Sequence, residues 1–305
     1  MIEILLAIFF ITVLLLFLSS GIWVAISMIG VSSIGMILFT SRPVGDAMAT
    51  TIWGASSSWT LTALPLFVWM GEILFRTKLS ENLFEGLAPW LQKLPGGLIH
   101  VNVVGCALFA AISGSSAATV ATVGKMSIPE LRKRKYPEKI LLGSLAGSGT
   151  LGLLIPPSII LIIYGVTVQE SIAKLFIAGI IPGIKIALIF MGYVIIWSLL
   201  NKNKMPLTEE NYSFLNKLSK SKQLIPVILL ILGVIGSIYT GIATATEAAS
   251  LGVVGALILS YFQKSLNLKT FKESLLGATK TSCMIAFILA GATFLSLAMG
   301  FTGLP

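Results

Sequence analysis

The chain is poor in the residues from which most enzymes and metalloproteins build their sites. It has 305 residues, of which two are cysteine, one is histidine and 11% are charged. Cys106 and Cys283 lie in apolar segments with no cysteine or histidine at metal-ligand spacing, so we expect both to be small buried apolar residues. His100 has no serine or carboxylate in a triad-like context, which favours an interfacial role over catalysis.

A nucleotide-binding loop is also missing, since no segment has the spacing G-x-x-x-x-G-K-[ST]. Energy for work at a membrane would therefore come from a gradient or from another chain. The net charge of +9 does not indicate nucleic-acid binding, because the basic residues lie in gaps between apolar segments and not on one face of a folded domain. We expect no nucleic-acid partner and no organic cofactor.

Apolar sequence is what the chain has in abundance. It is 56% hydrophobic with a mean hydropathy of +0.96, and apolar runs near the ~20 residues that cross a bilayer recur along its whole length. Ile2–Leu18 resembles a signal peptide, but Glu3 and the lack of a basic residue before the run indicate a retained helix. The sequence predicts an all-α, multi-spanning integral membrane protein.

Two short breaks interrupt long apolar stretches, and the first is Ser113-Gly114-Ser115-Ser116. Lipid cannot hydrogen-bond a freed backbone group, so unwound backbone at mid-membrane depth needs protein or a polar cavity around it. A helix beginning near Ser115 would point its N-terminal amides at an anion, while hydroxyls and unpaired carbonyls suit Na⁺. The small residues here are also typical of a helix-packing seam, and that alternative stays open.

The second break is Leu154–Ser158, which contains Pro156 and Pro157. Neither proline has an N–H, so carbonyls one turn earlier, around Gly152 and Leu153, lose their helical partners and could coordinate an ion. The alternative is an ordinary proline kink whose carbonyls bind a nearby serine or threonine. Paired broken helices are how secondary transporters build their sites, so the two breaks together favour solute transport.

The distribution of basic residues predicts that Leu98–Ser127 is a re-entrant hairpin. If this segment folds back at the first break, 18 of the 21 Lys and Arg residues fall on one side of the membrane, including Arg132–Lys135 and the lysines of Asn201–Lys222. Arg42, Lys174 and Lys185 would lie opposite. The positive-inside rule makes the rich side cytoplasmic, whereas a single crossing would scatter these charges over both faces.

Glu247 is the one acid well inside an apolar run. An intramembrane acid is a functional candidate by default. It lies within the first turn of its helix, where a carboxylate offsets the dipole and Thr244 or Thr246 can act as the cap. We favour the structural role.

The order and spacing of several short motifs resemble the large membrane subunit of tripartite ATP-independent periplasmic (TRAP) transporters over essentially the whole chain. These motifs are Leu64-Pro65-Leu66-Phe67, Leu94-Pro95-Gly96-Gly97, Ile112-Ser113-Gly114-Ser115, Ile155-Pro156-Pro157-Ser158-Ile159, Tyr164-Gly165, Ala178-Gly179-Ile180-Ile181-Pro182-Gly183 and Thr246-Glu247-Ala248-Ala249. Two departures are Thr119, where the family often has an acid, and Ala245, where it has proline.

The resemblance implies an elevator-type Na⁺ symporter in the bacterial inner membrane that imports an organic acid. A periplasmic substrate-binding protein would deliver the acid, and a small four-helix membrane subunit would brace the large one. The family's sodium-site residues carry over to Ser113, Ser115 or Ser116, Gly152, Ile155 and Pro157, mostly through backbone oxygens. We expect the acid to contact Gly114, Ser115, Ser116, Pro156 and Ser158.

The family is built from two inverted repeats, and we expect the second repeat to be incomplete in this chain, as in a fragment of a longer gene product or one piece of a split protein. We expect four parts: spanning and surface helices over 1–97, a transport core over 98–170, a spanning helix with a Lys-rich loop over 171–222, and the start of the second repeat over 223–305. We expect the gene to continue to a second Pro-Pro break, and this chain alone to be unable to transport. A non-transporting scaffold and, less favoured, a membrane enzyme acting on a lipid-linked substrate are the alternatives.

Overall fold

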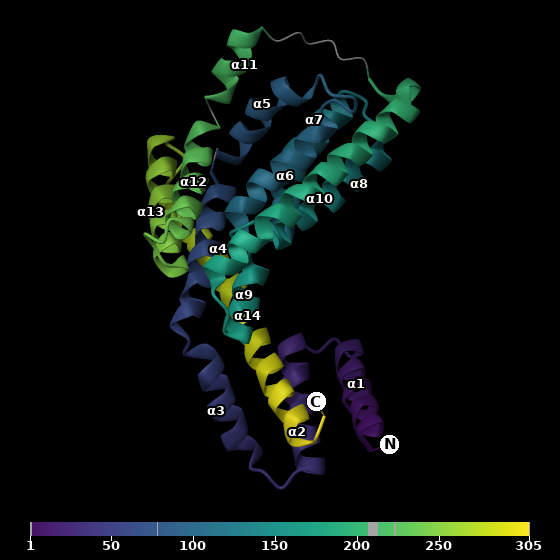
Figure 1. Cartoon of the computed structure of the whole chain (residues 1–305), viewed down its shortest axis with the longest axis vertical. Helices are drawn as coiled ribbons and strands as arrows, with labels where there is room; N and C mark the ends of the chain where they lie inside the picture. Colours follow the sequence, from purple (N-terminus) through teal and green to yellow (C-terminus); the bar gives the residue numbers. More distant parts are fainter. Residues whose placement is uncertain (1, 78, 207–212, 223, 305) are drawn as a thin grey trace. The chain divides into compact units, whose positions relative to one another are not determined.

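The computed structural model describes residues 2–77, 79–206, 213–222 and 224–304, and these contain helices but no strand. The prediction of an all-α protein is thereby confirmed. Contacts divide the chain into two compact units, residues 1–61 with 280–305 (unit 1) and residues 62–279 (unit 2) (Figure 1). This division does not test the four functional parts expected from the sequence, which stay predictions.

Unit 1 contains α1 (Ile2–Ser19), α2 (Val24–Phe39), α3 (Val44–Ser56) and the later part of α14 (Leu268–Phe301). Its interior is small and made of aromatic and aliphatic side chains. Leu6 and Phe10 of α1 pack with Val31 of α2, and Met36 packs with Phe294 and Ala298 of α14. Many outward side chains of α1 and α2 are apolar and exposed, as expected of helices that face lipid.

Unit 2 contains the remaining elements. The short η1 (Trp59–Thr62) crosses the boundary from unit 1. In chain order the others are α4 (Ala63–Phe75), α5 (Leu79–Leu91), α6 (Ile99–Ser113), α7 (Ser116–Lys133), α8 (Glu138–Gly149), η2 (Thr150–Leu153), α9 (Ile159–Val168), α10 (Ile172–Leu200), η3 (Lys202–Lys204), α11 (Phe214–Ser221), α12 (Ile225–Tyr239), α13 (Ala245–Phe262) and the beginning of α14.

Two groups of helices make up the body of unit 2. In the first, α13 packs along both α4 and α12. In the second, α6, α7 and α8 contact one another, and α10 contacts α6, α8 and α9. Helix α4 also contacts α6 and α9, so it joins the two groups and reaches the first break.

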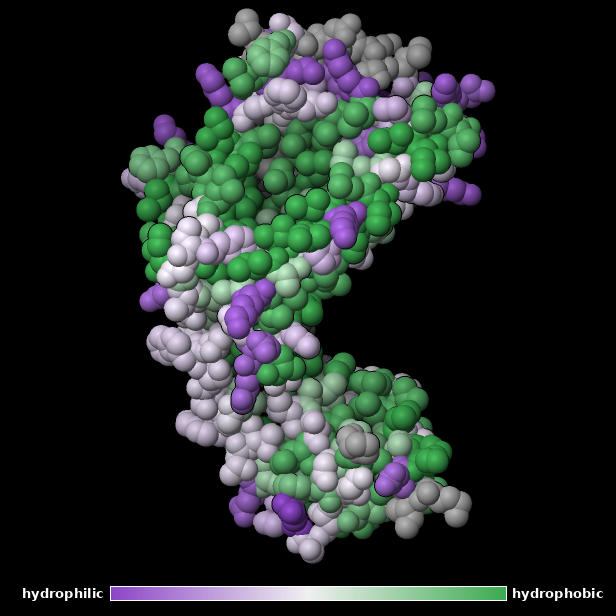
Figure 2. All heavy atoms as spheres, in the orientation of Figure 1, coloured by the Kyte–Doolittle hydropathy of each residue, from purple (hydrophilic) through white to green (hydrophobic). Residues whose placement is uncertain are grey.

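By length and composition, three helices among the described residues could cross a membrane, namely α10, α13 and α14, or up to four if one bent pair counts as a single span. Further apolar helices of 10–17 residues, including α6, α9 and α12, are shorter. The chain is therefore a multi-pass membrane protein. Figure 2 shows hydrophilic residues gathered around α11 and the C-terminal end of α10, while hydrophobic residues cover most of α10, α12 and α13.

Two segments differ from those expected. Helix α7 continues past Ser127, the expected end of the hairpin, and through Pro129 to Lys133, because Leu131 is fully buried and one proline removes only one helical hydrogen bond. The segment Asn201–Lys222, expected to be a loop, contains η3 and α11, while its residues 207–212 lie outside the described residues, as does Lys78.

Candidate functional site

The first break is a tight turn between two antiparallel helices. Helix α6 ends at Ser113, Gly114 has a left-handed backbone with φ of 58°, and Ser115 is the N-cap of α7. The Ala118 amide donates to the Ser115 hydroxyl at 3.4 Å. Inside the turn the Ser113 and Thr119 hydroxyls lie 3.0 Å apart, and both side chains are buried.

The two ends of α6 and α7 away from this turn also meet. The Leu98 amide donates to the Tyr136 hydroxyl at 3.1 Å, and burial raises the pKa of that hydroxyl. A Cβ on Gly105 would lie 3.6 Å from the Val123 side chain, and these residues are equally far from Gly114 in sequence. The segment is therefore a helical hairpin whose ends lie together, and the contact between the ends involves Tyr136, beyond the expected end at Ser127. That the hairpin is re-entrant in the bilayer stays a prediction.

The second break follows η2, where the chain leaves helical geometry from Leu154 until Ser158 caps α9. The Pro156–Pro157 peptide bond is cis. The Ile155 amide donates to the Leu151 carbonyl, and Pro156 has no N–H, so the Gly152 carbonyl has no donor at either helical spacing. The Leu153 carbonyl has also lost its helical donors, but the Ser158 hydroxyl donates to it at 2.7 Å, as the alternative of a proline kink expects.

The structure brings the two breaks into direct backbone contact. The Ile159 amide, in the first turn of α9, donates to the Gly114 carbonyl at 3.4 Å. A Cβ on Gly114 would lie 2.8 Å from the Pro157 carbonyl oxygen, and one on Gly152 would lie 3.0 Å from the Ser116 amide nitrogen. Neither position has room for a larger side chain without movement of the backbone opposite.

Glycines from two further helices line this contact. A Cβ on Gly71 of α4 would lie 2.8 Å from the Ser113 Cα. On α10, a Cβ on Gly179 would lie 2.6 Å from the Leu154 carbonyl oxygen, and one on Gly183 would lie 2.9 Å from the Ile155 side chain. At each of these glycines the nearest atom opposite is therefore a backbone atom or, at Gly183, the base of the Ile155 side chain.

The electrostatics of the contact come from helix ends and not from charged side chains. Helices α7 and α9 both begin here, with Ser115 and Ser158 as their N-cap residues, so the positive ends of two helix dipoles converge. Helix α6 and η2 both end here and bring carbonyl oxygens. Such a site can hold an anionic group at the helix starts and a hard cation at the carbonyls.

Most of the residues predicted for the site lie at this contact. Ser113, Gly114, Gly152, Pro156, Pro157 and Ser158 are buried, and Ser115 and Ser116 are half-buried. The Ser116 Oγ is itself buried, with no hydrogen-bond partner among the described residues. Ile155 differs, because its side chain packs against Gly183 and the Val103, Ala110 and Leu151 cluster, so that only its backbone could serve an ion.

Sequence reasoning missed the contributions of Gly71, Gly179 and Gly183, and it treated Thr119 only as a departure from a family pattern. A signal existed for two of them, since Gly179 and Gly183 have the small-x-x-x-small spacing of a close helix contact. Gly71 stands alone in an apolar helix, and its spacing carries no such signal.

The remaining candidates from the sequence have structural explanations. Glu247 and Thr244 form a reciprocal capping box at the start of α13, which confirms the structural role. The His100 Nε2 lies 2.8 Å from the Pro95 carbonyl oxygen at the start of α6. Cys106 is buried as expected, but Cys283 is exposed, so that prediction is wrong. No group of three His, Cys, Asp or Glu side chains in the described part of the chain could hold a metal ion.

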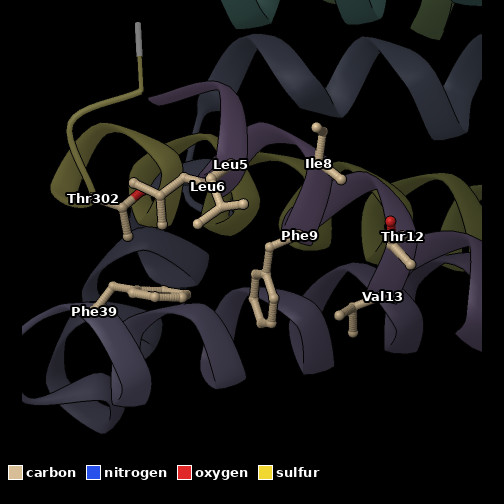
Figure 3. Close-up of a pocket in the computed structure, with 8 residues that line it drawn as sticks. All are labelled: Leu5, Leu6, Ile8, Phe9, Thr12, Val13, Phe39 and Thr302. Carbon is tan, nitrogen blue, oxygen red and sulfur yellow. The ribbon is translucent and has the colours of Figure 1, made fainter. Parts of the chain in front are cut away.

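A groove of about 550 Å³ in unit 1 is a poor site for a polar solute. Eight residues of α1, of the end of α2 and of the C-terminal segment line it, and Figure 3 shows that their only side-chain oxygens belong to Thr12 and Thr302. An apolar surface of this kind offers nothing to fix a carboxylate or an ion.

Comparison with known proteins gives consistent matches. Residues 11–305 match the family model of the tripartite ATP-independent periplasmic transporter, DctM component. A C4-dicarboxylate TRAP transporter large permease protein of Pseudomonas aeruginosa is 33% identical over 265 residues, which are 87% of this chain and 61% of that protein. An isethionate TRAP transporter permease protein of Oleidesulfovibrio alaskensis is 33% identical over 294 residues, 95% of this chain and 45% of that protein.

A sialic acid TRAP transporter large permease protein of Vibrio cholerae is 32% identical over 277 residues, 90% of this chain and 64% of that protein. The chain spans less than two thirds of the length of each of these three relatives. All three are named as transporter permeases, and none is named as an enzyme.

Proposed function

Because this chain belongs to the DctM component family of tripartite ATP-independent periplasmic transporters, whose members are permeases and not enzymes, we propose that it acts in a Na⁺-coupled importer of an organic acid. In this proposal the contact between the two breaks belongs to the transport site, in a bacterial inner membrane. A periplasmic binding protein delivers the acid, and a small four-helix membrane subunit supports the transport subunit as its core moves in an elevator motion.

The observation that carries the proposal is the meeting of the two breaks through the Ile159 amide and the Gly114 carbonyl. Two broken helices that converge give a membrane protein polar backbone groups at a depth where lipid could not satisfy them. The Gly152 carbonyl and the Ser113 and Ser116 hydroxyls are hard oxygen donors, the type that Na⁺ prefers. They belong to separate segments, so an ion held by both would couple its binding to the geometry of the contact.

The acid would be held by the helix starts and not by a basic side chain. Relatives are named for C4-dicarboxylate, isethionate and sialic acid, which all carry an anionic group. The N-terminal amides of α7 and α9 favour such a group without selecting the rest of the molecule. This arrangement supports a division of labour in which the binding protein selects the solute and the permease recognises only its anionic end.

Uptake by the complete transporter in proteoliposomes, with its partner subunit and binding protein, tests the proposal. We expect uptake of the acid to require an inward Na⁺ gradient. Replacing both Pro156 and Pro157 by alanine should let the helix close over the Gly152 carbonyl and abolish the Na⁺ response while expression is kept.

The matched control is Pro129→Ala, which removes an exposed proline from within α7, away from the breaks, and should leave the Na⁺ response in place. Uptake that ignores the Na⁺ gradient would refute the coupling. A normal Na⁺ response in the double proline variant would refute the assignment of the ion to this break.

A further inference from the structure

A polar cavity of about 720 Å³ lies within unit 2 and shares no lining residue with the two breaks. It is formed where the end of α4, the middle of α7 and the connection from α13 to α14 come together. The lining residues that matter here are Arg76, Lys125, Lys264, Asn267, Thr270 and Glu273. The volume is in the range of small-molecule sites, roughly 300–1,000 Å³.

The charges that line this cavity are mostly positive, and two of them are not neutralised. Arg76 donates to Glu72 at 3.0 Å and to Glu273 at 3.2 Å, so the one acidic side chain of the lining is already paired. Lys125 and Lys264 are exposed, and neither forms an ion pair with any carboxylate in the described part of the chain. An anion entering the cavity would meet two free ammonium groups.

The backbone conformation at Lys264, an exposed residue of the cavity lining, is well defined. Lys264 has φ of 53°, the left-handed conformation that ends many helices and that glycine adopts most easily. The Ser265 amide donates to the Ser260 carbonyl at 3.0 Å, which fixes this turn at the end of α13. The ammonium group is thus carried on a turn of defined geometry and not on a free loop.

The start of α14 adds polar groups to the lining of this cavity. The Asn267 side chain caps this helix by accepting from the Thr270 amide at 2.7 Å. The positive dipole end of this helix therefore belongs to the same cavity lining as Lys125 of α7. Cationic or dipolar groups come from three separate segments of the fold.

We propose that this cavity binds an oxyanion, a phosphate group held between Lys125 and Lys264. The phosphate could come from the headgroup of an anionic phospholipid or from a soluble anion, and the chemistry of recognition is the same for both. Bound there, it bridges the hairpin helix α7 to the connection between α13 and α14, and so stabilises the complete transporter.

The test measures the unfolding temperature of the complete transporter in nanodiscs. One arm compares phosphatidylcholine discs with discs that also contain phosphatidylglycerol. The other arm adds inorganic phosphate to phosphatidylcholine discs at constant ionic strength. We expect stabilisation in at least one arm: the lipid arm alone identifies a headgroup, and the phosphate arm identifies a soluble anion.

The double variant Lys125→Gln/Lys264→Gln should bind the anion about 30-fold more weakly, the loss expected for two ammonium contacts near a membrane surface. The control Lys139→Gln/Lys202→Gln removes the same charge from exposed positions outside the cavity and should behave as wild type. No stabilisation of wild type in either arm would overturn the proposal. The proposal would also be overturned if the cavity variant and the control variant were both stabilised like wild type, or if both lost this stabilisation.

Discussion

Gly152 lies so close to Ser116 that a single added carbon on Gly152 would be 3.0 Å from the Ser116 amide nitrogen. This distance is set by two backbones from different breaks, and neither can retreat as a flexible side chain could. The hairpin and the broken helix can therefore approach this closely only because residue 152 is glycine and has no side chain. The same relationship makes Gly152 the most direct probe of the site.

We expect Gly152→Val to abolish the Na⁺ response of uptake and to cost about 1–3 kcal/mol of stability through overpacking. Gly152→Ala should be milder, since a shift of a few tenths of an ångström accommodates one carbon. The matched control is Gly143→Val in α8, where an added Cβ meets nothing within 4 Å. Uptake against Na⁺ concentration is the measurement, and equal behaviour of the two valine variants would contradict the close contact.

Replacing Gly114 by alanine should separate backbone strain from steric clash. At Gly114 both are present, with φ of 58° and the Pro157 carbonyl oxygen 2.8 Å from an added Cβ. Gly241 has φ of 73° and open space, so Gly241→Ala suffers the strain alone, about 1 kcal/mol. We expect Gly114→Ala to lower the unfolding temperature more, and to impair uptake when Gly241→Ala does not. Equal losses would mean that the clash is relieved at no cost.

The Ser113–Thr119 pair allows stability and ion binding to be measured separately. Ser113→Ala leaves the buried Thr119 hydroxyl without this partner, which should cost about 1–3 kcal/mol. Adding Thr119→Val removes the stranded hydroxyl, so the double variant should recover most of the lost stability.

The Na⁺ response should not recover in this double variant, because the Ser113 oxygen is still missing. Thermal unfolding and Na⁺-dependent uptake are measured for the single and double variants together. Recovery of both properties would show that Ser113 serves only to pair with Thr119, and it would remove Ser113 from the ion site.

Labelling from outside intact cells tests which side of the membrane carries the basic segments. Cys283 is exposed, so a Cys283→Ser background comes first. Cysteine placed at Lys133 or Lys204 should not react with a membrane-impermeant thiol reagent, whereas cysteine at Lys174 on the predicted opposite side should react. All three lysines are exposed, so accessibility does not limit the comparison. Reaction of a cysteine at Lys133 would show that the basic side of the hairpin faces outward, opposite to the predicted orientation.

Lys264→Gly should raise stability and lower anion binding in the same protein. Glycine adopts the left-handed conformation at this position without strain, which is worth about 0.5–1 kcal/mol. The lost ammonium group removes one of the two proposed phosphate contacts. The comparison is Gln169→Gly, which relieves a similar φ of 57° outside the cavity and should gain stability while phosphate stabilisation is kept.

The breaks could be found from the sequence because glycine and proline act locally. Gly114 permits a left-handed turn and Pro156 removes a helical donor whatever surrounds them, so both interruptions were located to within a few residues. Counting charges predicts that Leu98–Ser127 is re-entrant; the structure has Leu98 in contact with Tyr136 beyond this segment, and re-entrancy stays a prediction. The capping role of Glu247 was likewise a matter of three-residue spacing.

The partners of the breaks could not be found in this way. In a membrane helix the faces toward lipid and toward protein are both apolar, so hydrophobic periodicity does not tell which face Gly71 occupies. The exposure of Cys283 was missed for the same reason. Helix α11 was missed because it is held by a remote residue, with the Trp90 indole donating to the Ser221 hydroxyl at 2.7 Å.

Glycine at the five positions Gly71, Gly114, Gly152, Gly179 and Gly183 has a consequence for how this protein tolerates random change. Every missense change in a glycine codon adds atoms, so no first step at these positions leaves the volume unchanged. Exposed apolar positions such as Leu188 and Ile196 can exchange one aliphatic residue for another at little cost. Most positions in this apolar chain should tolerate substitution in saturation mutagenesis. These five glycines should be intolerant, so the mutagenesis data alone would identify the residues of the contact between the breaks.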